Sequence, residues 1–163
     1  MSILTKLYVN QEELNILHYR LSVSQDADYT GRPSSKSVVQ PLEFTYETIK
    51  NDPFYEKMLN GKMTDSIKLV ITPIQMNAKR TTIELLDYYV LEQQDNFDGI
   101  NNRPMTTYVK ISFATLVVNG IVMHSKYWKV TNPLKNTVPI QTSPEEETEK
   151  ENTGLLADLE LSL

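Results

Sequence analysis

The stretch "TTYVKISFATLVVNGIVMHSKYWKV", residues 106–130, decides the fold class of this 163-residue chain. Two runs of alternating polar and apolar residues flank Asn119 and Gly120. An Asn-Gly pair is the strongest short signal for a two-residue β-hairpin loop, because both turn positions need positive φ angles. We therefore predict that residues 106–118 and 121–130 form an antiparallel hairpin.

The same two-residue period recurs along the preceding part of the chain and predicts further strands. They are expected over residues 3–9, 14–23, 41–49, 66–72 and 80–93. In the second of these strands we expect one unbroken alternation, which places Ile16 and His18 on the same face. The last contains two adjacent leucines, so we expect a long strand with room for a bulge.

One segment, residues 51–61, has the pattern of a short helix. Asp52 suits the N-cap, Pro53 suits the first helical position, and Gly61 suits the C-terminal stop. The apolar stripe of this helix is formed by Phe54, Met58 and Leu59. The fold class expected from these elements is mainly β: an antiparallel β-barrel of two packed sheets with one short flanking helix.

The charge of the chain is unevenly distributed. Of its 16 basic and 21 acidic residues, fourteen of each sign lie in residues 1–130, so the whole net charge of −5 falls in residues 131–163. A neutral body without a basic stripe argues against nucleic-acid binding, since phosphate contacts need clustered cations. The same lack of clustered cations argues against direct membrane binding.

The sequence carries no signal for Sec export or for thiol chemistry. It contains no cysteine, so neither disulfides nor thiolate reactions are expected. Residues 1–14 lack the basic and apolar regions of a signal peptide, and no run approaches eighteen consecutive apolar residues. We therefore expect a soluble chain.

Residues that commonly carry chemistry are few and scattered. His18 and His124 lie on predicted strands with no cysteine, histidine or carboxylate at metal-ligand spacing. Residues 95–99, "DNFDG", lack the alternating ligands and terminal glutamate of an EF-hand, so turn chemistry explains them better. We assign no catalytic, cofactor-binding or metal-binding residue and do not expect an enzyme.

A polar stretch, "SVSQDADYTGRPSSKSVV" at residues 22–39, separates the second and third predicted strands. Fixing such a loop on its own body costs about 1 kcal/mol or more per residue in conformational entropy, so we expect it to become ordered on a partner. Arg32 suits that contact because its guanidinium can bind a carboxylate bidentately, and Pro33 limits the freedom of the chain. The alternative is a mobile surface loop.

Two motifs, in this order and spacing, resemble those of a known family. The first is Thr-Gly-Arg-Pro-Ser-Ser at residues 30–35, which follows a strand ending in Leu-Ser. The second is an acidic and aromatic turn that leads into Pro-Met-Thr-Thr at residues 104–107. Over residues 1–130 the chain resembles the haemolysin-coregulated protein (Hcp, TssD) family of type VI secretion tube proteins, most closely the Bacteroidetes form.

The resemblance implies a structural protein with no cofactor. In that family, β-barrel subunits with a flanking helix form six-membered rings, which stack into a hollow tube inside a contractile sheath. The implied partners are other copies of the chain in homohexameric rings, sheath proteins, a spike protein and effector cargo. The implied location is the bacterial cytoplasm during assembly, followed by export through the injection system to the extracellular space or a target cell.

The resemblance also implies which residues make contacts between subunits. The loop at residues 24–40 is expected to dock on a neighbouring subunit, mainly through Asp28, Tyr29, Thr30, Gly31, Arg32, Pro33, Ser34 and Ser35. Ring stacking is expected to involve Asn102, Arg103, Pro104 and Met105. A tube that lets cargo pass needs a hydrophilic wall of mixed charge, which the neutral body permits.

The chain after residue 130 departs from the family pattern. We expect a barrel domain at residues 1–130, followed at residues 131–153 by an acidic linker rich in proline, threonine and glutamate. Residues 154–163 are rich in leucine and are not expected to stay in water, so we predict that they dock on the tube, its sheath or its cargo. The docking residues would be Leu155, Leu156, Leu159, Leu161 and Leu163.

Two other functions remain open from the sequence. A tube subunit of a phage-tail-like or extracellular contractile injection particle would share the fold, the ring and the loop. A monomeric ligand-binding β-barrel would instead contain an apolar cavity, with the loop at residues 22–39 as its lid.

Overall fold

The computed structural model describes residues 4–73 and 79–132. The chain divides into two units, residues 1–131 and residues 132–163, and the first is compact. The described elements of the first unit are β1 (Leu4–Val9), β2 (Glu12–Arg20), β3 (Val23–Ser24), β4 (Val38–Val39), β5 (Leu42–Glu47), α1 (Pro53–Asn60), β6 (Thr64–Thr72), β7 (Thr81–Asn96), β8 (Thr106–Val118) and β9 (Ile121–Ser125).

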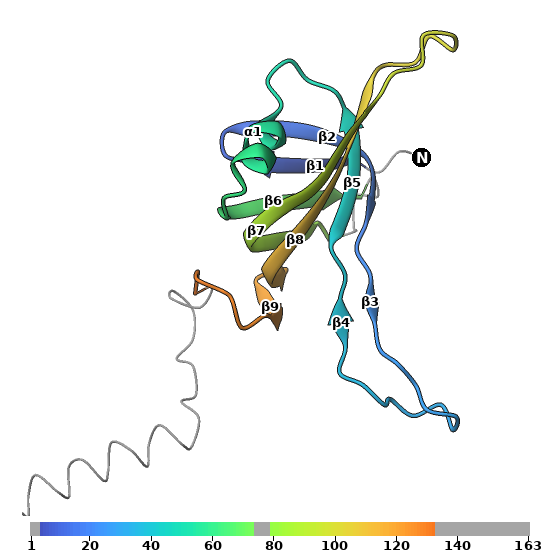
Figure 1. The fold of residues 1–163 in the computed structure, drawn as a ribbon, viewed down its shortest axis with the longest axis vertical. Coiled ribbons are helices and arrows are strands. Elements are labelled where there is room, and N and C mark those ends of the chain that lie inside the picture. The colour runs from blue at the N-terminus through green and yellow to red at the C-terminus, as the bar shows by residue number, and fades with distance from the viewer. Residues whose placement is uncertain (1–3, 74–78, 133–163) are drawn as a thin grey trace, which may run out of the picture. The chain divides into compact units, whose positions relative to one another are not determined.

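The strands form a closed antiparallel barrel, as the alternation in the sequence predicted (Figure 1). Its hydrogen-bonded order is β5-β2-β1-β6-β7-β8, and a further pairing of β5 with β8 closes the circle. β9 extends the sheet beyond β8 through the predicted Asn-Gly turn, in which Asn119 and Gly120 both have positive φ. β3 and β4 form a separate two-stranded ribbon.

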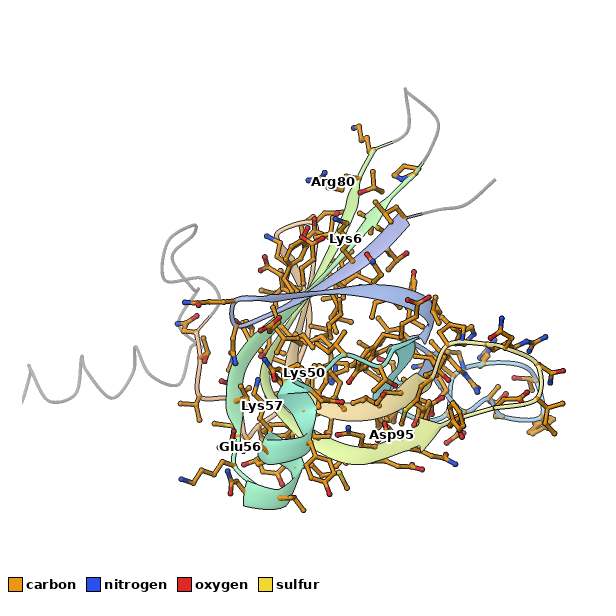
Figure 2. All side chains as sticks on the ribbon, turned by 90° about the horizontal axis from the view of Figure 1, so that it is seen from above. Lys6, Lys50, Glu56, Lys57, Arg80 and Asp95 are labelled. Atoms are coloured by element: carbon orange, nitrogen blue, oxygen red, sulfur yellow. The ribbon has the colours of Figure 1, made fainter. Side chains whose placement is uncertain are left out.

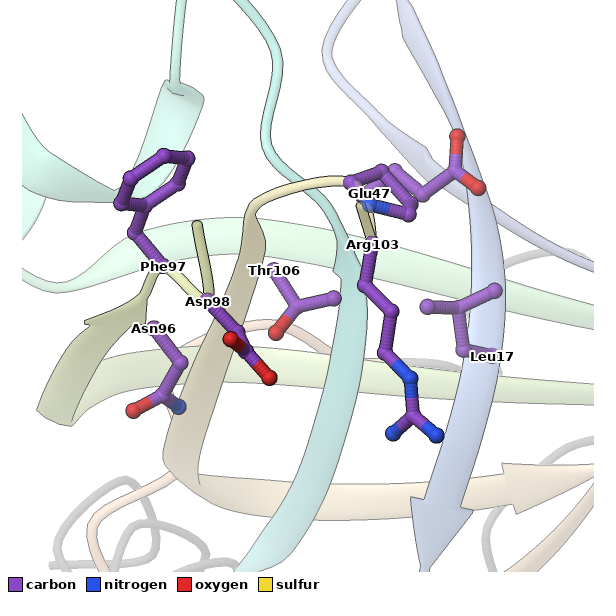
Figure 3. A pocket seen from close by; sticks show the side chains of 8 residues that line it. Leu17, Glu47, Asn96, Phe97, Asp98, Arg103 and Thr106 are labelled. Atoms are coloured by element: carbon purple, nitrogen blue, oxygen red, sulfur yellow. The ribbon is translucent and has the colours of Figure 1, made fainter. Parts of the chain in front are cut away.

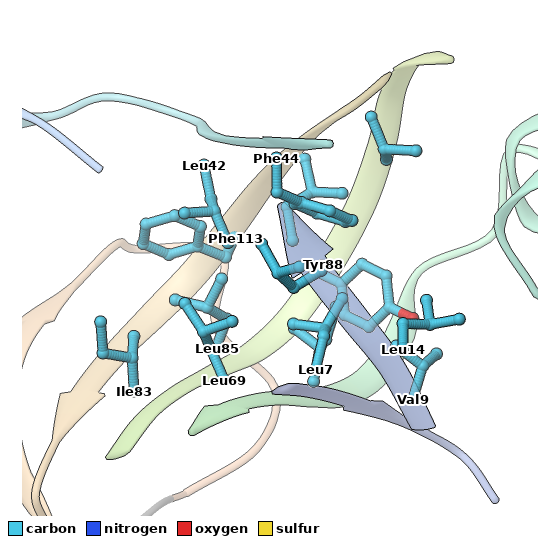
Figure 4. Close-up of a cluster of buried hydrophobic side chains, with 14 of the residues drawn as sticks. Leu7, Val9, Leu14, Leu42, Phe44, Leu69, Ile83, Leu85, Tyr88 and Phe113 are labelled. Atoms are coloured by element: carbon cyan, nitrogen blue, oxygen red, sulfur yellow. The ribbon is translucent and has the colours of Figure 1, made fainter. Parts of the chain in front are cut away.

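The interior of the barrel is filled with apolar side chains (Figure 4). The six barrel strands and α1 contribute inward residues, and these side chains are almost inaccessible to water. The largest of them are Tyr46, Tyr88, Phe44, Phe54 and Phe113. Burial of this apolar surface, at about 25 cal/mol per Å², is the main stabilising contribution to the fold.

Helix α1 packs against the barrel interior through one aromatic side chain. The Phe54 ring lies 5.4 Å from the Phe44 ring and 6.1 Å from the Tyr46 ring, measured between centroids. Both partners come from the inward face of β5. Lys57 lies on the same helix (Figure 2). Its Nζ donates a hydrogen bond of 2.7 Å to Tyr88 Oη of β7. The predicted stripe is therefore only partly buried, since Met58 and Leu59 are exposed.

The start of α1 is fixed by the predicted cap and by a polar network at the same place. Asp52 Oδ1 accepts a hydrogen bond of 2.8 Å from the Phe54 N–H, and Gly61 ends the helix in the left-handed conformation. Asp52 Oδ2 accepts hydrogen bonds from Tyr46 Oη at 2.7 Å and from Gln93 Nε2 at 2.8 Å. Burial, together with the hydrogen bond to Asp52, raises the pKa of Tyr46, so its hydroxyl stays protonated. This network joins the helix to β5 and β7.

One feature of β2 differs from the sequence prediction. The pairing of β2 with β5 shifts register between Ile16 and His18, so that Leu17 is an extra residue on β2. Such a bulge changes which side chains face inward. Ile16 points into the core before it and Tyr19 packs against the core after it, whereas His18 faces out. The expected common face for Ile16 and His18 was wrong.

A second break in alternation lies at Asp87 in β7. Asp87 has φ 54°, and Leu85 and Tyr88, three residues apart, both belong to the core. The Asp87 side chain is buried, and its Oδ2 accepts hydrogen bonds of 2.7 Å from the N–H groups of Val130 and Thr131. Thr131 Oγ1 donates a further bond of 2.5 Å to Oδ1. We call this arrangement the Asp87 clamp, because it fixes the chain where the first compact unit ends.

The Asp87 clamp depends on a charged carboxylate. Burial alone raises the pKa of Asp87, but the hydrogen bonds from Thr131 and Val130 outweigh burial and hold the pKa below its usual value. A lowered pKa in the folded state means that the carboxylate stabilises the fold above the pKa of the unfolded chain. That contribution is lost as the pH falls through the lower, folded-state pKa.

We predict that Phe54→Ala lowers the free energy of unfolding by about 3–5 kcal/mol, because it removes a fully buried ring and leaves a cavity. The measurement is urea unfolding followed by circular dichroism. The neighbouring Tyr55 is 58% exposed, so Tyr55→Ala is a matched control expected to change stability by about 0.5 kcal/mol or less. Equal effects of the two substitutions contradict the packing described for α1.

We predict that Asp87→Asn destabilises the fold by about 1–3 kcal/mol at neutral pH, because one acceptor oxygen and the negative charge are lost. The difference from the unsubstituted chain should shrink as the pH falls through the lowered folded-state pKa of Asp87, because the native carboxylate then becomes protonated as well. Urea unfolding at several pH values measures it. Asp26→Asn, at an exposed position, is the control. A difference that stays constant with pH contradicts the role of the charge.

Candidate subunit interface

The polar stretch predicted as a loop forms an ordered ribbon that projects away from the barrel (Figure 1). β3 and β4 pair with the register Val23↔Val39 and Ser24↔Val38. The Gln40 N–H donates a hydrogen bond of 2.9 Å to the Ser22 carbonyl at the base of the ribbon. We call residues 22–41 the arm.

The far end of the arm is held by the side chain of Asp28. Asp28 Oδ1 accepts hydrogen bonds from Thr30 Oγ1 at 2.6 Å, from the Thr30 N–H at 2.8 Å and from the Arg32 N–H at 3.0 Å. These bonds, above all that from the Thr30 hydroxyl, lower the pKa of Asp28. Gly31 has φ 83°, a conformation that glycine adopts without strain. Residues 28–32, the arm tip, are therefore a defined turn.

Cross-links between the two halves of the arm continue below the tip. The Asp26 N–H donates a hydrogen bond of 2.9 Å to Ser35 Oγ, and Gln25 Nε2 donates one of 2.7 Å to the Ser35 carbonyl. The Ser34 N–H bonds the Asp26 carbonyl at 2.8 Å. All eight residues nominated from the sequence, Asp28 to Ser35, thus lie in the end half of the arm.

Apart from Val39, which is buried at its base, the arm leaves most of its apolar and charged side chains open to water. Tyr29 is 100% exposed, and Val23 and Val38 are more than half exposed. The Arg32 guanidinium contacts no partner among residues 4–73 and 79–132. An isolated two-stranded ribbon is at best marginally stable in water. The arm is therefore suited to docking on another surface.

The connection between β7 and β8 projects from the barrel on the side away from the arm (Figure 1). It is held by Asp98, which accepts hydrogen bonds from the Ile100 N–H at 3.0 Å and from Asn101 Nδ2 at 2.5 Å. The four residues nominated for stacking, Asn102 to Met105, lie in this loop, and the Thr48 N–H bonds the Met105 carbonyl at 2.9 Å. The arm tip and this loop are not brought together within one subunit.

A pocket of about 460 Å³ lies beside this loop (Figure 3). We call it the loop pocket; its walls are Leu17, Glu47, Asn96, Phe97, Asp98, Arg103, Pro104 and Thr106. Of the sequence-nominated residues it contains Arg103 and Pro104. Glu47 and Leu17 were not nominated, because only the β2 bulge and the pairing of β5 with β8 bring them to this loop. Phe97 lies in the loop itself, but residues 95–99 were interpreted only as a turn.

The outward side of four adjacent strands forms a polar surface. In one row across β2, β5, β8 and β7 the paired residues are Arg20, Glu43, Lys110 and Glu92, whose charges alternate in sign. In the next row they are His18, Thr45, Tyr108 and Gln94. Lys110 Nζ lies 3.8 Å from Glu43 Oε1. We call these eight residues the polar sheet face.

The described residues contain neither a candidate metal cluster nor a membrane-spanning helix. Among them no group of three or more histidine, cysteine, aspartate or glutamate side chains is placed to hold a metal ion. No helix in the described part of the chain is long and apolar enough to cross a membrane. The nominated leucines Leu155, Leu156, Leu159, Leu161 and Leu163 lie outside the described residues, so their docking stays a prediction.

Comparison with known proteins identifies the family. A sequence model described as hemolysin coregulated protein Hcp (TssD) matches residues 1–129. A search of curated proteins found no significant match.

Solved structures share the fold. Hcp1 from Flavobacterium johnsoniae has a TM-score of 0.68 and 21% identity, covering 75% of this chain and 99% of that chain. Hcp1 from Escherichia coli EAEC 042 has a TM-score of 0.62 and 13% identity, covering 78% and 100%. Hcp1 from Salmonella typhimurium has a TM-score of 0.58 and 17% identity, covering 71% and 85%. The resemblance found in the sequence is confirmed: this chain belongs to the hemolysin-coregulated protein Hcp (TssD) family of type VI secretion.

Proposed function

We propose that this chain, a tube protein of the type VI secretion system, assembles into homohexameric rings that stack into a hollow tube. The observation that carries the proposal is the arm, an ordered ribbon that exposes Tyr29 and Arg32 away from the barrel. A subunit of a closed ring or an open stack needs two different contact surfaces, since each contact joins unlike patches. The arm and the β7–β8 loop supply one such pair.

Two free strand edges support closure of the ring. Among the described residues, β2 pairs only with β5 along residues 18–20, and β7 pairs only with β8 along residues 91–96. These edges flank the polar sheet face on opposite sides. An unpaired edge is a template for pairing with another chain. In the proposed ring, the β2 edge of one subunit meets the β7 edge of the next.

The polar sheet face is proposed as the wall of the bore. Positive and negative side chains alternate along this face, so it has no large region of a single charge. It also exposes no large apolar side chain that would bind passing cargo. The outward faces of β1 and β9 instead expose the apolar side chains of Leu4, Tyr8, Ile121 and Met123. Such side chains favour contacts with other proteins and would hinder the passage of cargo. The sheath, a spike and effectors are proposed partners, with assembly in the cytoplasm and export through the system.

The filled interior of the barrel argues against one of the two alternative functions. A ligand-binding barrel needs a cavity, but here Phe44, Tyr88 and Phe113 fill the interior and are inaccessible to water. A tube subunit of a phage-tail-like or extracellular injection particle is compatible with the same surfaces. The Hcp (TssD) family match favours type VI secretion over that alternative.

We predict that the purified chain forms rings and tubes, seen by negative-stain microscopy and by light scattering after size exclusion. Replacing residues 25–37 by Asn-Gly, which keeps the pairing of Ser24 with Val38, should leave the barrel folded but abolish tubes. Lys68→Ala on β6 is the control and should assemble normally. A full-length chain that stays monomeric at high concentration contradicts the proposed function.

We predict that the polar sheet face is shielded in assembled tubes. The chain has no cysteine, so Thr45→Cys on β5 and Lys68→Cys on β6, the opposite strand of the barrel, each give one thiol. A bulky polymer maleimide should label Thr45→Cys much more slowly in tubes than in dissociated subunits, while a small maleimide labels both. Lys68→Cys should react with the bulky reagent in both states. Equal rates for Thr45→Cys in tubes and subunits rule out this face as the bore wall.

A further inference from the structure

We propose that the subunit binds a small phosphate monoester in a pocket at the base of the arm, with the Arg20 guanidinium as the principal donor to the phosphate group. The pocket has a volume of about 430 Å³. We call it the arm-base pocket; its polar side chains are Arg20, Ser22, Ser24, Gln40, Glu43 and Lys110. The inference goes beyond the proposed function, since all these side chains belong to one subunit.

The arm-base pocket lies where the arm joins the barrel (Figure 1). The chain enters the arm after Arg20, at the end of β2, and returns to the barrel at β5. The hydrogen bond of 2.9 Å from the Gln40 N–H to the Ser22 carbonyl joins the two crossings. β8 pairs with β5 and places Lys110 opposite Glu43. Three paired strands therefore hold the charged side chains of the pocket near one another.

The arm-base pocket has an excess of positive charge. Two cations, Arg20 and Lys110, line it together with one carboxylate, that of Glu43, which leaves a net charge of +1. The loop pocket has the opposite balance, since Glu47 and Asp98 line it with a single cation. An anion is therefore attracted to the arm-base pocket and repelled from the loop pocket.

The donors of the arm-base pocket are open to a ligand. The Arg20 guanidinium takes part in no ion pair or side-chain hydrogen bond with residues 4–73 and 79–132. Lys110 Nζ lies 3.8 Å from Glu43 Oε1, which is longer than a hydrogen bond, so this contact leaves its N–H groups available. Ser24 Oγ accepts a hydrogen bond of 3.3 Å from Gln40 Nε2, and its own hydrogen is left to donate.

The number and kind of these donors favour a phosphate group over a carboxylate. A guanidinium binds two phosphate oxygens through two parallel hydrogen bonds. A phosphate monoester has three such oxygens and a charge of about −1.5 to −2 at neutral pH, so one oxygen remains for Lys110 or Ser24. A carboxylate has two oxygens, which Arg20 alone would satisfy.

The pocket also has room for the organic part of the ester. Its volume of about 430 Å³ lies in the range of small-molecule sites, which is about 300–1,000 Å³. The ring of Pro41 lines the same pocket and offers an apolar surface to an organic group. We therefore infer a phosphate ester as the ligand, with the phosphate group at Arg20.

The first test is calorimetric titration of the purified chain with phenyl phosphate. Phenol, which has the same ring and no phosphate, is the control. Phenyl phosphate and inorganic phosphate should both bind, more weakly as the salt concentration rises, and phenol should not bind. Benzoate that binds as tightly as phenyl phosphate contradicts the choice of a phosphate group. If neither phosphate probe binds, the proposal is overturned.

The second test locates the site. Arg20→Gln should weaken phenyl phosphate binding about tenfold or more, because two charge-assisted hydrogen bonds are lost. Glu43→Gln should strengthen binding about threefold, because it removes the one negative charge of the pocket. Arg103→Gln, in the loop pocket, is the matched control and should leave the affinity unchanged. A purely structural role for Arg20 and Glu43 would give losses at both positions, and such a result contradicts the proposal.

Circular dichroism checks that each variant is folded. If Arg20→Gln does not fold, Lys110→Gln replaces it and should weaken phenyl phosphate binding about threefold or more. An unchanged affinity in the folded cation variant overturns the proposal. The outcome is independent of assembly: a chain that binds phenyl phosphate but forms no tubes contradicts only the proposed function, and tubes that bind no phosphate contradict only this inference.

Discussion

The pairing of β5 with β8 is the constraint on which the rest of the molecule depends. Six consecutive residue pairs, from Leu42↔Ile111 to Glu47↔Thr106, join the two strands and turn an open sheet into a barrel. On the inner side, this pairing positions Phe44 and Tyr46, against which Phe54 of α1 packs. Outward, it brings Glu43 beside Lys110 and so builds the polar sheet face. The arm leaves the barrel between β2 and β5, so closure also sets its direction.

A barrel filled with side chains has no room for a ligand, so its function must reside on its outside. The described surface offers an arm, a loop pocket, two free strand edges and a polar sheet face. Among the described residues none of them contains a cluster of side chains placed to hold a metal ion. Together they suit a subunit whose task is to hold other copies in place around an opening.

Local sequence signals predicted the elements well. Asn119-Gly120 fixed the last hairpin, and Asp52, Pro53 and Gly61 fixed the bounds of α1. The reversal at Leu17 was not predictable, since leucine is an ordinary residue whose position is imposed by pairing across the sheet. A bulge was expected in β7, and the register shift between Val90 and Glu92 confirms it. The left-handed conformation of Asp87 in the same strand was not predicted. The ribbon in the arm was read as a loop, because strands of two residues carry no periodic signal.

The candidate surfaces were predicted only where they are continuous in sequence. The end half of the arm and the loop residues Arg103 and Pro104 could be nominated directly. Glu47 and Leu17 could not, because they join the loop pocket only through barrel closure and the β2 bulge. The two rows of the polar sheet face were not predicted either. They depend on the register between neighbouring strands, which the sequence of one strand does not determine.

The Asp87 clamp has a mechanical consequence. A pull on the chain beyond residue 132 is transmitted through the three hydrogen bonds at Asp87 to β7, an interior strand of the barrel, before it can peel β9 from the sheet edge. Force applied to the chain after residue 132 is thus shared among the hydrogen bonds of the Asp87 clamp, which must break together. A load attached after this point therefore acts on the wall of the barrel and not on the exposed edge of its sheet.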